Sequence, residues 1–391
     1  MTYDFDTVID RRDTSAIKIE MMRDIWGRTD LIPLWVADMD FATPDFIRDA
    51  VCHRLEHPIL GYTAKPDHYF AAIARWVNRR YGMGVASDDL NFVPGIVAGL
   101  GMAINCFSEV GDRVMLFSPV YPPFSWLCTR NHREVVDCPL RLEGSRYHLD
   151  LELIRRKAQG VRLIMLCNPH NPGGVVWQRE ELEELSKIAE ENHILVLSDE
   201  IHADLTLPPH KHTAYATISD AARQNSVTFM APSKTFNMPG MTASHAIIFN
   251  PDLRVQFTAH LDAGEFNMGH VFAFDTVAAA YDNGEEWLAQ CLKYIQGNID
   301  FVVDFLHANT PRIAAIRPEA SFLVWLDCRA LGLPTEELNR FFVEDAGLAL
   351  NDGATFGENG AGFMRLNIAT PKKVLERAME QLKTAYKKRN F

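Results

Sequence analysis

Several classes of protein are excluded by what this sequence has little of, beginning with cysteine. Seven cysteines are scattered through 391 residues, and no two of them form a C-x-x-C pair. A disulfide framework or a zinc site would show closer and more regular spacing. We therefore expect reduced thiols, no metal site and a cytoplasmic protein.

Long apolar segments and an excess of positive charge are also missing. One uncharged run, residues 90–108, is interrupted by Pro94 and three glycines, so it cannot form a membrane-spanning helix. No positively charged segment followed by an apolar one opens the chain, so we expect no signal peptide. The net charge of −12, from 39 Lys and Arg against 51 Asp and Glu, argues against nucleic acid or an anionic membrane as the main partner.

The composition that remains is that of an ordinary globular protein. Hydrophobic residues make up 47% of the chain and charged residues 23%, which disfavours disorder, coiled coils and fibres. At roughly 100–200 residues per domain, the length predicts two to three domains.

Short apolar runs that end in turn residues recur through the middle of the chain. They lack alternation, as expected of strands buried on both faces of a parallel sheet, and they cover residues 114–117, 163–167, 194–197, 227–230 and 246–249. Helical patterns lie between them at 150–158 and 179–192, the second with Leu182, Leu185, Ile188 and Ala189 on one stripe. This alternation predicts an α/β fold.

The pattern changes near residue 283. Long helical stretches at 285–307 and 372–388 flank strand-like segments at 322–326 and 362–367. We expect three parts: residues 46–283 form a large cofactor-binding domain, residues 284–391 form a smaller α+β domain, and residues 1–45 join the small domain.

Polar side chains follow the predicted strands, where ligands bind in an open parallel sheet. Lys234, in Ala-Pro-Ser-Lys-Thr-Phe-Asn, comes directly after the strand at 227–230 with no other charge near it. Burial would lower the pKa of its amine and make it a nucleophile able to form a Schiff base. The alternative is a lysine that extends from the strand end into solvent.

Asp199 and Asn171 follow two other strands. A carboxylate at Asp199 can keep a pyridinium nitrogen protonated, although Ser198 and Asp199 also suit the N-cap of a helix. Asn171, in Asn-Pro-His-Asn-Pro-Gly-Gly, can donate an amide hydrogen to a phenolate-like ring oxygen, whereas most such clusters are only turns.

Three further features add to this chemistry. Residues 94–100 predict a loop that opens a helix, where backbone N–H groups can bind phosphate, but they match neither a P-loop nor G-x-G-x-x-G. Tyr121 can stack on a flat ring or pack against the neighbouring prolines. Arg365, the only charge in an apolar run, can bind a carboxylate with two hydrogen bonds or form a buried ion pair.

In their order and spacing, these residues resemble the motifs of the fold type I pyridoxal-phosphate (PLP) enzymes, the aspartate aminotransferase superfamily. Within it, the chain looks like the MalY/PatB-like cystathionine β-lyase (C–S lyase) subgroup. The likeness runs from Trp35-Val-Ala-Asp-Met-Asp-Phe to Arg365-Leu-Asn, with 28 residues from Asn171 to Asp199 and 35 from there to Lys234. It implies a large PLP-binding domain with a mainly parallel sheet sandwiched by helices, and a smaller α+β domain.

The resemblance implies a role for each matching residue around the cofactor ring. Lys234 would hold PLP as a Schiff base, Asp199 would pair with the pyridine nitrogen, and Asn171 with the ring oxygen. Tyr121 would stack on the ring and assist proton transfer. His202, a further cofactor-binding residue, stands where many aminotransferases have a tyrosine, and this form is typical of the β-lyase subgroup.

The resemblance also implies how the phosphate is held. Ser233 and the backbone N–H groups of Ile96 and Val97 would contact it, and Tyr62 would reach it from the other subunit of a homodimer. Many aminotransferases add an arginine eight residues after the lysine, where this chain has Thr242. More of the phosphate binding must therefore come from N–H and hydroxyl donors.

For the substrate, the resemblance implies that Arg365 binds the α-carboxylate of an amino acid, with Ala37 and Asp38 lining that end of the site. The implied reaction is β-elimination from L-cystathionine or related L-cysteine S-conjugates, giving pyruvate, ammonia and a thiol. An aminotransferase uses the same residues and is the first alternative. A regulatory protein that retains the cofactor site is the second. No G-x-S-x-G or H-E-x-x-H motif supports a hydrolase.

Overall fold

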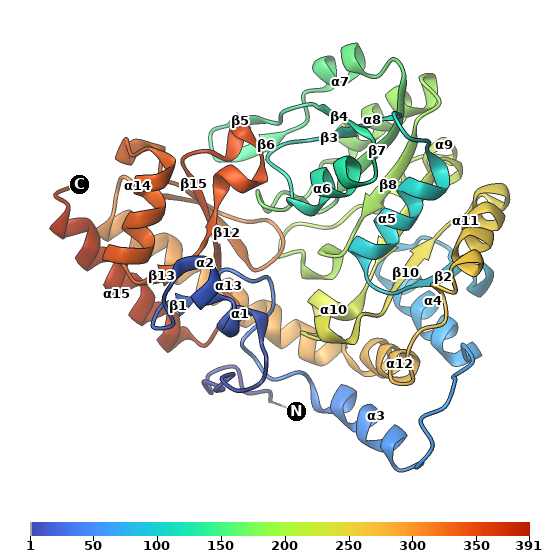
Figure 1. Ribbon diagram of the computed structural model, residues 1–391, viewed down its shortest axis with the longest axis horizontal. Coiled ribbons are helices and arrows are strands. Elements are labelled where there is room, and N and C mark those ends of the chain that lie inside the picture. Colours follow the sequence, from blue (N-terminus) through green and yellow to red (C-terminus); the bar gives the residue numbers. More distant parts are fainter. Residues whose placement is uncertain (1) are drawn as a thin grey trace.

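The computed structural model describes residues 2–391 and has an α/β architecture built on one large sheet (Figure 1). Seven strands lie side by side in the order β2-β10-β9-β8-β7-β3-β4. Their bounds in that order are Leu90–Val93, Ser244–Ile247, Ser226–Met230, Leu195–Asp199, Val161–Cys167, Arg113–Leu116 and Glu134–Asp137. The pairs from β9 to β4 are parallel, so the expected mainly parallel sheet is confirmed.

Helices cover both faces of this sheet because its central strands are apolar on both sides. In β8, Leu195 and Leu197 belong to an apolar cluster between one face of the sheet and one layer of helices, while Val196 belongs to a cluster on the opposite face. The first layer contains α5 (Ile96–Phe107), α6 (Pro123–Arg130) and α11 (Pro251–Ala263). The second contains α7 (Leu151–Lys157), α8 (Arg179–Glu191), α9 (Asp220–Gln224), α4 (Asp67–Tyr81) and α12 (Ala273–Asn283). Burial of Leu182, Leu185, Ile188 and Ala189 confirms the apolar stripe expected on α8.

Strand β10 differs from the strand expected at residues 246–249. It covers Ser244–Ile247 and runs antiparallel to both β9 and β2. A parallel return needs a crossover long enough to carry the chain back along the sheet, usually a helix. The connection from β9 holds only α10 (Pro232–Thr235) and a short turn at Pro239–Met241, so the chain comes back antiparallel.

The C-terminal part forms a separate, antiparallel sheet. Its strand order is β11-β12-β15-β14, with bounds Ala314–Ile316, Leu323–Asp327, Phe363–Asn367 and Asn351–Asp352. Helices α13 (Glu285–Asn309), α14 (Thr335–Arg340) and α15 (Lys372–Lys388) accompany it. The helices expected at 285–307 and 372–388 and the strands expected at 322–326 and 362–367 are all present, within one or two residues.

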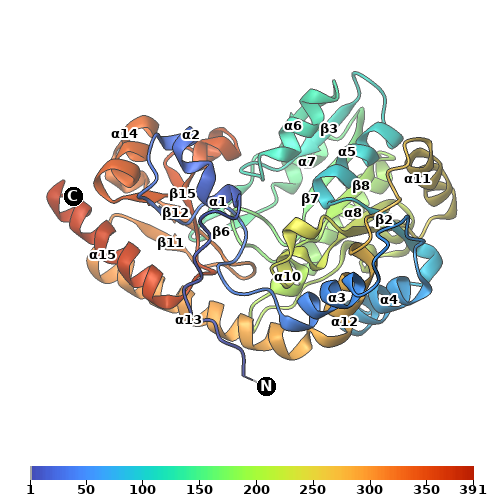
Figure 2. The same cartoon turned by 60° about the horizontal axis from the view of Figure 1, so that its bottom comes forward.

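The N-terminal segment lies against this C-terminal part. Strand β1 (Ile32–Pro33) pairs in parallel with β13 (Leu348–Ala349), and Figure 1 shows α1 (Ile17–Glu20) and α2 (Met22–Trp26) near these strands. Figure 2 shows both short helices on the side of the molecule that holds β12, β15 and α14. Helix α3 (Asp45–Leu55) then leads to the large sheet, and a small hairpin joins β5 (Arg141–Glu143) to β6 (Arg146–His148). These contacts agree with a small domain built from both chain ends, and the boundaries at 45 and 283 stay a prediction.

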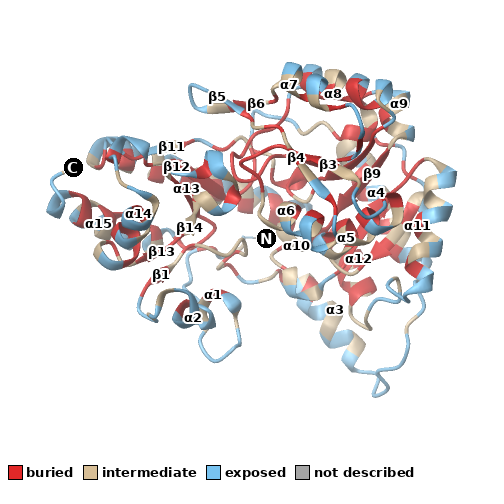
Figure 3. Ribbon diagram, turned by 45° about the horizontal axis from the view of Figure 1, so that its top comes forward, coloured by how far each residue is buried: buried red, intermediate tan, exposed pale blue. Residues whose placement is uncertain are grey.

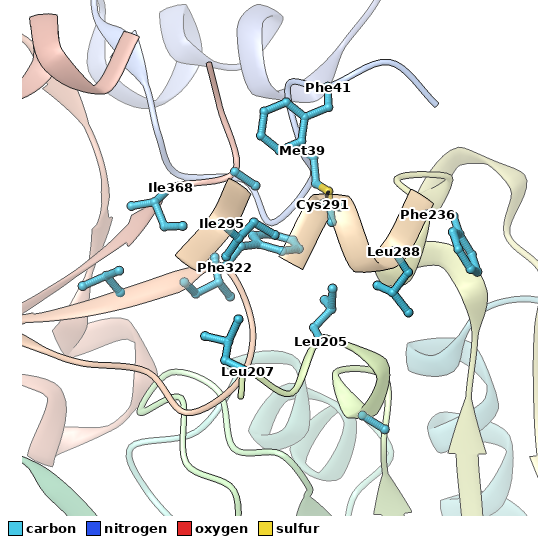
Figure 4. Packing of buried hydrophobic residues seen from close by; sticks show 14 of the residues in the cluster. Met39, Phe41, Leu205, Leu207, Phe236, Leu288, Cys291, Ile295, Phe322 and Ile368 are labelled. Atoms are coloured by element: carbon cyan, nitrogen blue, oxygen red, sulfur yellow. Dashed lines mark hydrogen bonds between the residues drawn. The ribbon is translucent and has the colours of Figure 1, made fainter. Parts of the chain in front are cut away.

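The buried residues concentrate in the sheet and on the inner sides of the helices (Figure 3). One apolar cluster continues from α4 and α12 along α13 into the C-terminal sheet. Figure 4 shows its centre, where Cys291 and Ile295 of α13 lie among side chains from the N-terminal segment and from the segments that flank strands of both sheets. Within residues 2–391, no helix combines the length and the apolar character that a membrane crossing requires.

Candidate active site

A cavity of about 230 Å³ lies at the carboxyl ends of the parallel strands, where an open α/β sheet binds its ligands. Nine of the residues expected at a PLP site line it: Ala37, Ile96, Val97, Tyr121, Asn171, Asp199, His202, Ser233 and Lys234. They come from the carboxyl end of β8, from the segments that follow β2, β3, β7, β8 and β9, and from the N-terminal segment, so the sheet brings together residues far apart in the sequence.

Lys234 lies on the one-turn helix α10, just after β9, and its half-buried side chain lines this cavity. Its Nζ donates a hydrogen bond to the carbonyl oxygen of Ala37, at 2.6 Å. Burial lowers the pKa of the Lys234 ammonium to about 8, although the nearby carboxylates of Asp38 and Asp199 oppose the shift. A substantial fraction of the amine is therefore neutral near physiological pH.

Asp199 is the last residue of β8, and only 5% of it is exposed. Burial, reinforced by the neighbouring Glu200, raises its pKa to about 7, and a hydrogen bond from the Ile201 N–H at 3.1 Å offsets part of that rise. A buried carboxyl of this kind gains from a cationic hydrogen-bond donor brought into the cavity. A protonated pyridine nitrogen is such a donor.

Asn171 and Arg365 are joined by a hydrogen bond although 194 residues separate them, with Arg365 Nη1 donating to Asn171 Oδ1 at 3.1 Å. Because Oδ1 accepts this bond, the amide Nδ2 is the atom left to donate to a ring oxygen in the cavity. Arg365 Nη2 donates to Asn351 Oδ1 at 2.7 Å and to the Trp35 carbonyl at 3.3 Å.

The Arg365 guanidinium itself is ready to bind an anion. Only 4% of the residue is exposed, its Nε has no hydrogen-bond partner among the described residues, and it lies 4.9 Å from the centre of the Phe356 ring. Burial lowers its pKa to about 10, so it stays charged at neutral pH. No carboxylate pairs with it within residues 2–391, which removes the structural ion pair left open by the sequence.

One end of the cavity lies where β2 leads into α5. Gly95 caps the helix with φ +100°, a conformation that favours glycine, and the first-turn N–H groups at Ile96 and Val97 have no acceptor within the helix. The start of a 12-residue helix favours an anion. Ser233, Thr242 and Ser244 line the same cavity, and a hydroxyl is a possible hydrogen-bond donor to an anion there.

Tyr121 and His202 complete the walls. Burial raises the pKa of the Tyr121 hydroxyl, which therefore stays protonated at neutral pH. His202 is 3% exposed, and its Nδ1 has no partner in the described structure. Burial, together with the charges of Lys234 and Arg365, lowers the His202 pKa to about 3, so the ring is neutral.

Asp38 lies beside this cavity rather than in it, in a groove that Ala37 and Lys234 share. Its carboxylate pairs with Arg11 at 2.6 Å, and Asp40 pairs with the fully buried Lys18 at 2.9 Å. Burial alone would raise the pKa of Asp38, but Arg11 and Lys18 hold it below its usual value. These pairs fix the segment whose carbonyl at Ala37 receives the Lys234 hydrogen bond.

Three expected site residues do not line the cavity: Asp38, Arg365, which is hydrogen-bonded to the lining residue Asn171, and Tyr62, which is remote from it. Tyr62 is 99% exposed, on a loop after α3 that projects from the body in Figures 1 and 3. The sequence did not point to Asn351, Ser244 or Cys167, and no motif distinguishes them. The structure adds Asn351 to the site because it pairs with Arg365 between β14 and β15. It adds Ser244 and Cys167 because they line the cavity.

Comparisons with known proteins agree with this geometry. The family model for aminotransferase class I and II matches residues 29–382. Cystathionine beta-lyase PatB from Bacillus subtilis is 38% identical over 383 residues, which cover 97% of this chain and 99% of that protein. The crystal structure of cystalysin from Treponema denticola, which contains PLP, has a TM-score of 0.96 and 32% identity, covering 99% of this chain and 100% of that one.

A third comparison gives the same result. The PLP-bound C–S lyase from Staphylococcus hominis has a TM-score of 0.91 and 33% identity, covering 98% of each chain. The resemblance and the fold class inferred from the sequence are thereby confirmed. The protein is a member of the aminotransferase class I and II family of fold type I PLP enzymes.

Proposed function

We propose that this protein is a PLP-dependent carbon–sulfur β-lyase that cleaves L-cystathionine or related L-cysteine S-conjugates to pyruvate, ammonia and a thiol. One observation carries the proposal. A half-buried lysine of lowered pKa shares a cavity with Asp199 and with an asparagine bound to Arg365, in a chain similar over its whole length to enzymes named cystathionine β-lyase and C–S lyase.

The residues present fit PLP at each of its polar ends. Asp199 offers a buried carboxyl for the ring nitrogen, and the amide Nδ2 of Asn171 faces no competing acceptor among the described contacts. The start of α5 and the hydroxyls of Ser233 and Thr242 offer donors for a phosphate. The positions of these residues support the assignments made from the sequence, which stand as part of the proposal.

When bound, PLP supplies an electron-withdrawing ring that stabilises the carbanion formed as substrate Cα loses its proton. The side chains of this protein do the rest. Arg365 binds the substrate carboxylate through guanidinium N–H groups and sets the orientation of Cα. Lys234 accepts the Cα proton on Nζ, since at a pKa of about 8 roughly a tenth of the free amine is neutral at pH 7. Tyr121, protonated and beside Arg365, can donate a proton to a departing group.

The competing function is that of an aminotransferase, which the family model also covers. The two are separated by incubating the purified holoenzyme with L-cystathionine, with and without an added keto acid, and measuring pyruvate and free thiol. The lyase produces both without any keto acid. If pyruvate and thiol appear only when a keto acid is present, the proposed function is wrong.

We further propose that the protein is a homodimer in which Tyr62 reaches the partner's cavity. Tyr62 projects on a loop that also exposes Ile59 and Leu60 and that follows the exposed Leu55 at the end of α3. Such a group of exposed apolar side chains marks an interaction site. Light scattering tests the dimer. Mixing inactive Lys234→Ala subunits with Tyr62→Ala subunits tests the reach, because only a shared site restores one intact cavity per hybrid dimer.

The cytoplasm is the compartment we propose. All seven cysteines are unpaired, and five of them are buried, as suits a reducing environment. Cell fractionation with an antibody against the chain tests this assignment.

A further inference from the structure

Asp204 is a buried carboxylate that does not line the cavity but accepts hydrogen bonds from several side chains. It lies in a short turn, Ala203–Leu205, immediately after His202, and is 5% exposed. Its oxygens accept hydrogen bonds from Trp76 Nε1 at 3.0 Å, from the Tyr81 hydroxyl and from Thr235 Oγ1 at 2.9 Å. The guanidinium of Arg80 forms an ion pair with it at 2.9 Å.

These donors come from two elements. Three of them come from α4: Trp76, Arg80 and Tyr81. Arg80 balances the negative charge of the Asp204 carboxylate, and the other two donate hydrogen bonds to it. Thr235 belongs to α10 and is the residue next to Lys234. A carboxylate that is already held by α4 therefore holds α10 through a single hydrogen bond.

Helix α10 needs an external anchor because it has only four residues, Pro232–Thr235. An isolated helical turn is not stable by itself, since its own hydrogen bonds do not repay the loss of backbone freedom. The chain leaves the helix at once, with Asn237 at φ 50° and bound through its side chain to the backbone at Met39 and Phe41. Both anchors, Thr235 and Asn237, follow Lys234 within three residues of the chain.

Apolar side chains next to Asp204 and Thr235 pack together, but apolar packing is not directional and does not orient the hydrogen bond between these two residues. Leu205 follows Asp204 and Phe236 follows Thr235, and Figure 4 shows both beside Leu288 of α13. Packing of this kind resists separation of the two segments. The hydrogen bond from Thr235 to Asp204 is the directional contact between the two segments.

We propose that Asp204, acting through Thr235, is a positioning residue for Lys234. The inference rests on the proposed function only in taking Lys234 as the residue that carries PLP. Reactions at such an amine are sensitive to position, and a displacement of about 1 Å costs on the order of a hundredfold in rate.

Covalent capture of the cofactor tests the proposal without reference to the lyase reaction. In this step the Lys234 amine condenses with the aldehyde of PLP, forming one C=N bond and releasing one water. The full-length protein is freed of cofactor, mixed with PLP, and the rate of the absorbance change is measured. Binding of pyridoxine 5′-phosphate, which has no aldehyde, reports separately on the cavity.

Three variants are compared with the parent. Thr235→Val has nearly the same shape but no hydroxyl, and Thr235→Ser keeps the hydroxyl. Tyr81→Phe is the matched control, because it removes a different hydrogen bond to the same carboxylate without touching α10. We expect Thr235→Val to slow capture roughly 10- to 100-fold. Thr235→Ser and Tyr81→Phe should stay within about threefold of the parent, and all should bind pyridoxine 5′-phosphate equally.

The proposal is overturned by either of two results. Capture by Thr235→Val at the parent rate would mean that the hydrogen bond does not place the lysine. Equal losses of capture and of pyridoxine 5′-phosphate binding would mean that Thr235 and Asp204 only maintain the fold. A protein that captures PLP as expected but releases no pyruvate from L-cystathionine would leave this inference standing and contradict the proposed function alone.

Discussion

The hydrogen bond between Asn351 and Arg365 offers a sharp test of how the substrate carboxylate is bound. Arg365 Nη2 donates to Asn351 Oδ1 at 2.7 Å, the shortest of its three hydrogen bonds. The two residues face each other in register between β14 and β15. Replacing Asn351 with alanine removes this acceptor and leaves Arg365 held by Asn171 and by the Trp35 carbonyl.

The expected size of the effect follows from this geometry. A hydrogen bond that involves a charged group contributes about 1.5–3 kcal/mol, and each 1.4 kcal/mol is a factor of about ten in an equilibrium constant. Asn351 is only half-buried, so water replaces part of the lost interaction. We expect the lower end, roughly a tenfold rise in KM. The value of kcat should change little, because Lys234 and Asp199 are untouched and the carboxylate contact is made before and during the reaction.

Steady-state kinetics with L-cystathionine measures both constants. Asn339→Ala is the matched control: it removes the hydrogen bond from Asn339 to Asp352, the next residue of β14, and does not touch Arg365. Asn339→Ala should leave KM unchanged. If Asn351→Ala keeps the parent KM, or if both variants raise KM alike, then Asn351 does not orient the arginine and the reasoning is refuted.

Three further predictions concern the lysine, a buried histidine and the phosphate end. Lys234→Ala should lose both covalent PLP and pyruvate formation, while Lys211→Ala, an exposed lysine on another loop, should lose neither; absorbance and pyruvate assays decide. His245 is fully buried, and neither ring nitrogen has a hydrogen-bond partner in the described structure. Burial lowers the pKa of His245 to about 3. Below pH 6.5 the unfolded chain therefore binds a proton at this histidine that the folded chain does not. His245→Phe should therefore gain about 2 kcal/mol more stability at pH 5 than at pH 7.5, at about 1.4 kcal/mol per pH unit below 6.5, and equal gains in urea unfolding at both pH values would contradict this. Gly95→Ala should weaken pyridoxine 5′-phosphate binding in a fluorescence titration more than Gly82→Ala does. Both glycines have a positive φ and room for a Cβ, but of the two only Gly95 lines the cavity. Similar losses of binding in the two variants would contradict a phosphate site at Gly95.

Much of the fold could be predicted because its local signals are strong. The apolar stripe of α8 and the uninterrupted apolar strands β7, β8 and β9 each carry their own periodicity, and all were placed within two residues. The direction of β10 was not predictable in this way, because strand direction is set by the length of the connection and by pairing with β2 and β9. Asn351 and Asp204 were missed for a related reason, since a single polar residue carries no pattern.

The family, the fold class and the residue types of the site follow from the sequence, because a buried strand followed by Lys, Asp or Asn at fixed spacing is a local feature. The surroundings of Lys234, Arg365 and Tyr62 are visible only in the tertiary structure. It partly buries Lys234 and so lowers its pKa, it pairs Arg365 with two asparagines instead of a carboxylate, and it leaves Tyr62 in solvent. The burial of a side chain and the identity of its partners depend on distant parts of the chain that come together at one edge of the sheet. A local sequence pattern therefore cannot predict them.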